Sequence, residues 1–230
     1  MIIGSLLSDP ARVAIMMALA GGEALRPGEL AKRAAVAPST ASFHLAKLMD
    51  AGWIVHDQQA AIRRYKLASP EVAEILEHLA YVAPPAPVSS LRGHQAREAL
   101  REARCCYDHM AGTLGVSLTQ ALLRQDVLRA CGDHFQLTAD GGQWLRNRAM
   151  SLPEPGVDKR AFARPCLDWT ERGCHLAGRL SAAILTHWTE HGYVIRPEKA
   201  RSLRVTSAGH EQLIAWGITK LSHEPTAAGS

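Results

Sequence analysis

The sequence predicts a mainly helical α+β protein with small β-wings, divided into two parts. Apolar residues recur at helical spacing through most of the chain, and short alternating runs between them are typical of two-stranded wings. The segment 84–93 contains three prolines, two serines and a glycine, which indicates a linker. We expect a first domain over 1–83, a linker over 84–93, a second domain over 94–222 and a flexible tail over 223–230.

The segment Leu25 to Leu67 predicts a helix, a turn, a second helix and a two-stranded wing. The first helix is expected over Arg26 to Ala34, where an early proline fits because its missing N–H is not needed there. The second helix begins at Pro38 or Ser39, and Gly52 ends it in the left-handed conformation that glycine tolerates. This layout is the one with which small proteins place a helix in the DNA major groove.

The second of these helices has two contrasting faces. Spacings of three and four residues predict a buried stripe formed by Ala41, Leu45, Leu48 and Met49. The opposite face is expected to be exposed, with short donors and acceptors and one flexible cation near the N-terminal end, where a recognition helix contacts bases and phosphates. The predicted DNA-binding residues of this helix are Pro38, Ser39, Thr40, Ser42, His44 and Lys47.

The wing follows directly. Trp53 to Val55 is predicted as a buried first strand, Asp57 to Ala61 as a polar tip, and Ile62 to Leu67 as an alternating return strand. On the return strand Arg63 and Arg64 suit a phosphate backbone, so we add both to the DNA-binding set. A helical hairpin with a wing can also be a packing module that binds no DNA, and this alternative stays open.

At these residues the chain resembles the ArsR-type winged helix-turn-helix repressors. The resemblance rests on the sequence before the first long helix (8–12), on the predicted recognition helix (38–48) and on the entry to the wing (51–55). It covers a little over a third of the chain. The resemblance implies a homodimer that binds an inverted-repeat operator in double-stranded DNA and is released by an inducer, often a metal ion, a metalloid or an oxidant.

Two departures from that family restrict what the resemblance implies. The best-known metalloid site of the family uses a cysteine pair near the first helix of the motif, and the segment 28–33 has no cysteine. A second common site uses acidic and histidine ligands on the dimer helix, where this chain offers Glu74 and His78 without further ligands. Neither familiar sensor site can be assigned, so the sensor is expected beyond the linker.

The segment Pro70 to Val82 predicts a helix for dimerisation, with the segment Ser8 to Ala20 beside it. One side of the helix is apolar and consists of Val72, Ile75, Leu76 and Leu79. Reading DNA with one motif per chain usually pairs two half-sites, which favours a homodimer. The alternative is that the apolar stripe only covers the core of its own domain.

Beyond the linker the sequence repeats weakly. The segment 135–145 is similar to 203–213, with a threonine followed by a glycine after three residues and a leucine after seven in both copies. Each copy predicts a short strand, a threonine N-cap and a helix, preceded by another helix over 117–124 and 176–191. One interpretation is two degenerate winged helices that serve sensing or dimer support; chance similarity is the other.

All five cysteines lie beyond the linker, and their odd count and irregular spacing argue against a disulfide framework. We expect a helix over 94–110 to bring a thiol next to an imidazole, and a turn-rich segment over 164–176 to hold a second cluster. The candidate metal-binding or redox-sensing residues are Cys105, Cys106, His109, Cys166, Cys174 and His175.

These two clusters leave three interpretations open. If they meet, three thiolates could bind arsenite or antimonite, or a mixed sulfur and nitrogen set could bind a borderline metal. Neighbouring arginines could instead lower a thiol pKa and create an oxidant- or electrophile-sensitive switch. The third interpretation is that the cysteines are buried core residues. We expect an inducer of the thiophilic metal or metalloid class and no cofactor required for folding.

Composition restricts the remaining function classes. The chain has 230 residues, 47% hydrophobic, and a net charge of +4, which allows a nucleic-acid partner without requiring one. No apolar run approaches the roughly 18 residues that a membrane helix needs, and the first residues lack a signal sequence, so a cytoplasmic protein is expected. Cys106, His109 and Asp108 are residue types of a thiol enzyme, but closeness in sequence is poor evidence, and no phosphate-binding glycine loop is present. We expect no enzyme.

Overall fold

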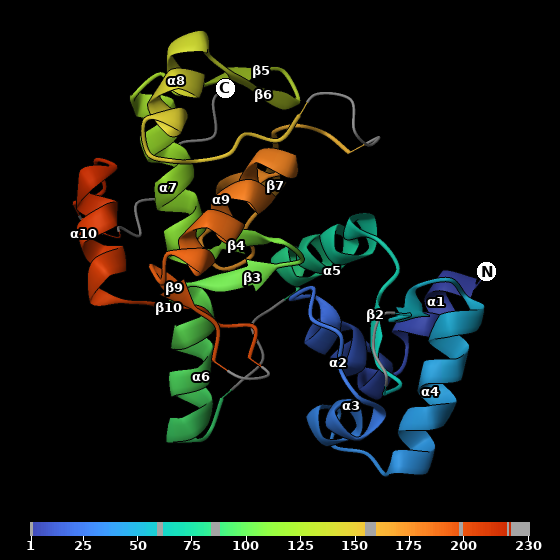
Figure 1. Ribbon diagram of the computed structural model, residues 1–230. Helices are drawn as coiled ribbons and strands as arrows, with labels where there is room; N and C mark the ends of the chain where they lie inside the picture. Colours follow the sequence, from blue (N-terminus) through green and yellow to red (C-terminus); the bar gives the residue numbers. More distant parts are fainter. Residues whose placement is uncertain are drawn as a thin grey trace. The chain divides into compact units, whose positions relative to one another are not determined.

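The computed structural model describes residues 2–58, 62–83, 88–154, 160–197, 200–219 and 221. The chain forms two compact units, Met1–Leu79 and Ala80–Ser230 (Figure 1). Part of the predicted wing tip (59–61), part of the predicted linker (84–87) and the predicted tail (223–230) lie outside the described residues. The predicted domain limits therefore stay predictions.

The first unit has the predicted winged helix-turn-helix order. Its elements are α1 (Ile2–Leu7), α2 (Pro10–Leu19), α3 (Pro27–Arg33), α4 (Pro38–Asp50), β1 (Ile54–His56), β2 (Tyr65–Leu67) and α5 (Pro70–Val82). Strands β1 and β2 pair antiparallel, and an isolated bridge joins Leu25 to Tyr65 through hydrogen bonds of 2.9 and 2.8 Å. The core beneath them contains Ile15, Met16, Leu19, Leu30, Leu45, Leu48, Ile54 and Leu67.

The second unit begins with α6 (Leu91–Glu102) and then contains the same order of elements twice: hairpin, helix, hairpin, helix. The first copy is β3 (Arg104–Cys106), β4 (His109–Ala111), α7 (Gly112–Arg124), β5 (Leu128–Cys131), β6 (His134–Leu137) and α8 (Ala139–Arg146). The second copy is β7 (Arg164–Leu167), β8 (Cys174–Ala177), α9 (Arg179–Glu190), β9 (Val194–Ile195), β10 (Arg204–Val205) and α10 (Ser207–Ala215). Helices with small antiparallel strand pairs make the chain α+β, as the sequence predicts.

The last helix of each copy begins in the same way. Thr138 accepts a hydrogen bond from the Gly141 N–H at 2.8 Å, and Thr206 accepts one from the Gly209 N–H at 3.0 Å. A Cβ at either glycine would lie 2.2 or 2.1 Å from a backbone carbonyl oxygen, so both positions need glycine. The threonine and glycine spacing in the sequence thus corresponds to the same N-cap and close approach in both copies.

The copies pack against each other through their first hairpins. Strand β4 contacts β8, and each of these strands also contacts the long helix of the other copy, with α9 on β4 and α7 on β8 (Figure 1). The core between them includes Trp188 and Trp216, whose rings meet edge to face at 5.3 Å. In the described part of the chain no helix has the length and apolar character to cross a membrane.

Two predictions of helix are wrong, one at the first hairpin of each copy. The predicted helix over 94–110 ends at Glu102, because Ala103 is extended and Tyr107, at φ 57°, turns β3 into β4. The predicted helix over 176–191 begins only at Arg179. Residues 174–177 are a strand there, and Gly178, at φ 94°, separates it from the helix. Strands of three or four residues are too short for their alternation to stand out in a sequence.

Candidate nucleic-acid interface and candidate metal centre

Helix α4 exposes the polar face that the sequence predicts, apart from one residue. Pro38, Ser39, Thr40, Ser42 and Lys47 are exposed, and Ser42 Oγ donates a hydrogen bond to the Pro38 carbonyl at 2.9 Å. On the opposite face of α4, three of the four predicted stripe residues are fully buried and the fourth is half-buried. The helix therefore offers hydroxyl groups and one ammonium group to a partner over its first three turns.

His44 is not part of that exposed face. Its side chain is buried, with Nδ1 3.3 Å from Arg12 Nη1 and Nε2 3.7 Å from Asp9 Oδ2. The placement of His44 among the exposed residues is therefore corrected. The buried positions of α4 are Ala41, His44, Leu45 and Leu48, a spacing of three, four and seven residues that puts all of them on one side. His44 ties α4 to the start of α2.

Phe43 is an exposed apolar residue that the sequence reasoning missed. Its side chain is 57% exposed, and Lys47 Nζ lies 4.5 Å from the centre of its ring. An apolar side chain on a recognition helix can contact the methyl group of thymine. The signal was available, because Phe43 lies outside the buried spacing that contains Ala41 and Leu45.

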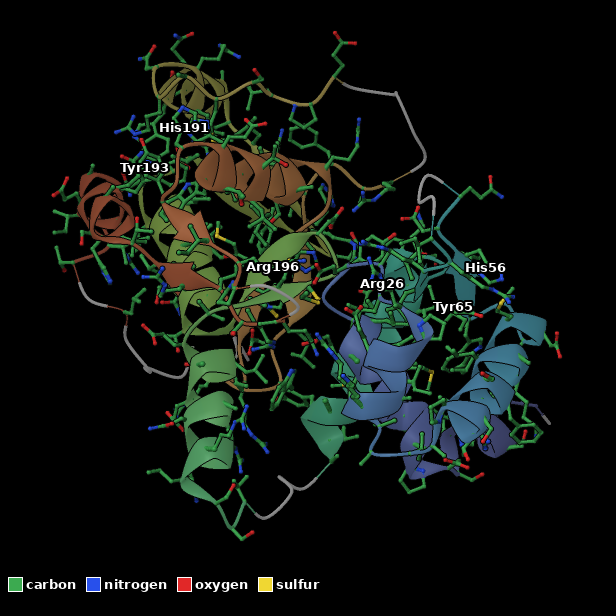
Figure 2. All side chains as sticks on the ribbon, turned by 60° about the horizontal axis from the view of Figure 1, so that its bottom comes forward. Arg26, His56, Tyr65, His191, Tyr193 and Arg196 are labelled. Carbon is green, nitrogen blue, oxygen red and sulfur yellow. The ribbon has the colours of Figure 1, made fainter. Side chains whose placement is uncertain are left out.

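The wing places one of its cations, Arg63, beside two aromatic rings. Arg63 Nη2 lies 2.9 Å from His56 Nε2, and its guanidinium lies 5.6 Å from the centre of the Tyr65 ring. Figure 2 shows His56 and Tyr65 together on this wing, with ring centres 4.6 Å apart. Arg64 is half-buried just before β2. The first strand is less buried than predicted: of residues 53–55 only the middle one is buried, because successive side chains point to opposite faces.

In the second unit, the two predicted clusters of thiols and imidazoles form one group. Cys106, His109, Cys166 and His175 each offer a ligand atom, and these atoms all lie within 4.8 Å of one another. All four side chains are buried. Among the described residues, no other group of three or more His, Cys, Asp or Glu side chains offers ligand atoms in this way.

Cys105 and Cys174, the other two candidates, lie outside this group. Cys105 is the neighbour of Cys106 on β3, so it points to the opposite face, where its Sγ donates to the Tyr107 carbonyl at 3.4 Å. Cys174 is exposed and precedes His175 on β8. The group therefore contains two thiols, and the predicted set of three thiolates is not assembled.

The four side chains come from two matching hairpins. Cys106 is directly opposite His109 across β3 and β4, and Cys166 is directly opposite His175 across β7 and β8. The sequence pattern Arg-X-Cys-X-Asp begins at 104 and at 164, and the pattern His-X-Ala-Gly begins at 109 and at 175. This repeat is the signal that the sequence reasoning did not find.

A glycine ends each of these hairpins and fixes where the next helix starts. Gly112 has φ 76° and Gly178 has φ 94°, both in the left-handed region that other residues rarely adopt. A Cβ at these positions would lie 2.4 Å from the Arg101 carbonyl oxygen and 2.7 Å from that of Ala161. Strands β4 and β8 are thus each connected to the following helix by a glycine in the left-handed conformation.

The two imidazoles face each other and have a carboxylate behind them. His109 Nε2 lies 3.1 Å from His175 Nε2. On the far side of each ring, His109 Nδ1 lies 3.3 Å from Asp108 Oδ1, and His175 Nδ1 lies 3.0 Å from Asp168 Oδ2. The second contact is close enough for an ion pair but is not aligned as a hydrogen bond. Carboxylates placed in this way orient histidine ligands in metal sites.

Each carboxylate is itself held by an arginine. Asp168 is fully buried, 3.2 Å from Arg104 Nη2, and accepts hydrogen bonds from the Gly112 N–H at 2.7 Å and from the Thr170 hydroxyl at 2.7 Å. Asp108 pairs with Arg160 at 2.7 Å and is partly exposed. The two positions match in sequence but differ in burial.

Burial and neighbouring charges shift the pKa values of these groups. Burial raises the pKa of Asp168, but contacts with His175, Arg104 and Thr170 outweigh it and lower that pKa well below its usual range. Burial lowers the pKa of His175, yet Asp168 and Cys106 raise it to about 9. Burial also raises the pKa of the Cys105 thiol to about 11, which makes its reactive thiolate scarce.

The arrangement suits closed metal coordination better than catalysis. Two thiols and two imidazoles are the donor set of closed four-coordinate zinc sites, whereas catalytic zinc sites keep one position open for water. The cluster is buried, and the described residues leave no fifth donor in the group.

Comparisons with known proteins match both units. A family model described as bacterial regulatory protein, arsR family, matches residues 9–55. YdfF of Bacillus subtilis (strain 168), an uncharacterized HTH-type transcriptional regulator, is 39% identical over 207 residues, covering 90% of this chain and 92% of YdfF. An NMR structure of CMTR, a cadmium metal-sensor from Mycobacterium tuberculosis, is 30% identical and covers 40% of this chain and 98% of that one, at a TM-score of 0.32.

Proposed function

Because this chain belongs to the ArsR family of HTH-type transcriptional regulators, we propose that it is a homodimeric repressor that binds an inverted-repeat operator and is released by an inducer. Its relatives by sequence are transcriptional regulators and not enzymes. The first unit would bind double-stranded DNA, and the second would sense the inducer. Such a regulator acts where the DNA is, so a cytoplasmic location is part of the proposal.

The observation that carries DNA binding is the exposed polar face of α4 next to a basic wing. Ser39, Thr40 and Lys47 are exposed on α4, where they can reach base edges and phosphates. Arg63 is exposed at the wing, where it can contact the phosphate backbone. Among the described residues, no carboxylate forms an ion pair with Lys47 or Arg63, so both cations are available to a polyanion. The proposed contact set is completed by Pro38, Ser42 and Arg64. His44 does not belong to it, because its buried side chain contacts Arg12 and Asp9.

An apolar stripe on α5 supports the dimer. Leu76 is buried within its own chain, whereas Ile75, Leu79 and Val82 are exposed at a spacing of four and three residues. Exposed apolar residues that line up along one side of a helix are typical of a surface covered by a partner. A second copy of this chain is the partner proposed, because an inverted-repeat operator is read by two motifs related by a two-fold axis.

The buried cluster supports a sensor for a metal ion over a thiol switch. A reactive cysteine needs a low pKa and access to solvent. Burial raises the pKa of Cys105, and burial together with Asp168 raises the pKa of Cys174. Cys106 and Cys166 are instead turned toward two imidazoles. A thiol-based oxidant or electrophile sensor remains the second candidate, at Cys106 and Cys166.

Operator binding tests the proposal. The full chain is titrated against DNA from upstream of its own gene at several salt concentrations, with Lys47→Ala and Arg64→Ala as variants. Each variant should weaken binding and reduce the slope of log affinity against log salt by about 1, as expected for the loss of one phosphate contact. Arg129→Ala is the matched control, because this exposed arginine pairs with Asp126 in the second unit. Wild-type affinity and slope in both test variants would contradict the proposed contacts.

A further inference from the structure

We infer that Cys106, His109, Cys166 and His175 bind one divalent metal ion of the zinc class, in a four-coordinate shell built from two matching half-sites. The inference deepens the sensing part of the proposed function and rests on it for its regulatory meaning. The metal binding itself rests on the geometry of the hairpins β3–β4 and β7–β8.

The distances fit a tetrahedral ion. Zn–N bonds of about 2.1 Å separate two nitrogen ligands by about 3.4 Å in a tetrahedron. The two Nε2 atoms are 3.1 Å apart, and all four donor atoms lie within 4.8 Å of one another. Small side-chain rotations would therefore close the shell. With Cys105 turned away and Cys174 exposed, no third thiolate is in place for a trivalent metalloid.

The orientation of the histidines points to a cation between them. The carboxylates of Asp108 and Asp168 lie beside the two Nδ1 atoms and favour a proton there. The two Nε2 atoms then face each other at the centre of the cluster, 3.1 Å apart. Without an ion, a proton on one ring can bridge the two Nε2 atoms, and a metal ion would take the place of that proton and accept both lone pairs.

The charges in the cluster select a divalent ion. Two thiolates neutralise a divalent ion, and both imidazoles are neutral as ligands. The carboxylates behind them are already paired, Asp108 with Arg160 and Asp168 with Arg104. A divalent ion therefore leaves the buried site without net charge, whereas a monovalent or trivalent ion would leave one charge unbalanced in a region of low dielectric.

The duplication makes the ion a link between the two copies. Each hairpin supplies one thiol and one imidazole, so neither copy can fill a tetrahedral shell alone. The ligand strands β4 and β8 continue directly into α7 and α9 through Gly112 and Gly178. Binding of the ion would fix the position of one copy relative to the other, and this is the change that an inducer could impose on the second unit.

The first test uses Co²⁺ as a spectroscopic probe on the full chain after treatment with a chelator and a reductant. We expect one Co²⁺ per chain, with the intense visible bands of a tetrahedral ion, a thiolate-to-cobalt band, and displacement by Zn²⁺. Cys106→Ser and Cys166→Ser should each remove the thiolate band in part and weaken Co²⁺ binding at least tenfold. Cys174→Ser, a change beside a ligand but outside the cluster, should match the wild type. A wild type without the tetrahedral spectrum, or one that Cys106→Ser and Cys166→Ser both leave unchanged, would overturn the inference.

A second variant avoids substitution of the ligands themselves. Asp108→Asn should weaken Co²⁺ binding about 10- to 100-fold, the usual effect of losing a carboxylate behind a histidine ligand. Asp133→Asn is the matched control, because Asp133 Oδ1 contacts the neighbouring His134 Nδ1 at 3.2 Å in the same way, but on an exposed turn. Equal affinity in these two variants would contradict the orientation of His109 on which the inference depends.

Operator binding measured on the same samples separates this inference from the proposed function. Tetrahedral Co²⁺ binding with a change in operator affinity supports both. Tetrahedral Co²⁺ binding without any change in operator affinity supports the metal site and contradicts its role as a sensor. Operator binding by a chain that takes up no Co²⁺ or Zn²⁺ overturns the metal site and leaves the DNA-binding proposal intact.

Discussion

The winged-helix unit and the duplicated unit use similar elements but place their polar side chains in opposite ways. On α4 the polar residues Ser39, Thr40 and Lys47 are exposed. In the first hairpins of the duplicated unit, Arg104 and Asp168 are fully buried and paired with each other. An exposed polar group keeps its water until a partner arrives, whereas a buried one must be satisfied within the chain. Substitutions should therefore affect binding in the first unit and stability in the second.

The largest effect is expected at Arg104. Arg104→Met leaves the carboxylate of Asp168 buried with one cation fewer, and loss of one partner of a buried pair typically costs about 3–5 kcal/mol. The measurement is the free energy of unfolding in urea, followed by circular dichroism.

Arg160→Met is the matched control, since Arg160 pairs with the equivalent carboxylate Asp108 at a partly exposed position and should cost about 1 kcal/mol or less. Similar losses in the two variants would show that burial does not distinguish the two copies.

His44 is the one predicted DNA-binding residue that resembles the second unit in its burial. His44→Ala removes contacts to Arg12 and Asp9, and we expect a loss of about 1–3 kcal/mol in the free energy of unfolding. Operator affinity at a temperature where the variant is folded should change little. Lys47→Ala, three residues away on the exposed face, should weaken operator binding and leave the free energy of unfolding nearly unchanged. A His44→Ala variant with wild-type stability but weakened operator binding would instead indicate that His44 contacts the DNA.

The smallest effect on stability is expected at Phe43. Because its ring is mostly exposed, Phe43→Ala should change the free energy of unfolding by no more than about 0.5 kcal/mol. It should weaken operator binding up to about tenfold, or about 1.4 kcal/mol, if the ring contacts a base. Ile214→Ala, an exposed apolar residue of α10, should alter neither quantity. Full operator affinity in Phe43→Ala would contradict a contact between this ring and a base.

The first unit could be predicted from sequence because its signals are local. Gly52, at φ 72°, ends the second helix of the motif as expected, and α5 spans Pro70–Val82 as predicted. His44 was misplaced because a polar residue within a buried spacing was assigned by its type. Its burial depends on Arg12, 32 residues earlier in the chain, and the sequence alone does not show that contact.

The buried cluster could be predicted only in part. The sequence pointed to Cys106, His109, Cys166 and His175 by residue type, but it placed the first pair on a helix and included Cys105 and Cys174. His109 and His175 are 66 residues apart, and only the packing of β4 on β8 brings them together. The repeat of the patterns Arg-X-Cys-X-Asp and His-X-Ala-Gly was hard to find because its two halves are spaced differently. Asp108 directly precedes His109, whereas six residues separate Asp168 from His175. That insertion changes the repeat spacing within the hairpin.

The two half-sites belong to one polypeptide, and this determines how occupancy of the proposed metal site would depend on the concentrations of metal and protein. Once one hairpin holds the ion, the other is present at an effective concentration of roughly the millimolar range or higher, as for modules joined by a short tether. Occupancy would then follow free metal alone and would not change when the protein is diluted or when its subunits separate. At a site shared between subunits, by contrast, metal occupancy would fall when the protein is diluted and when its subunits separate.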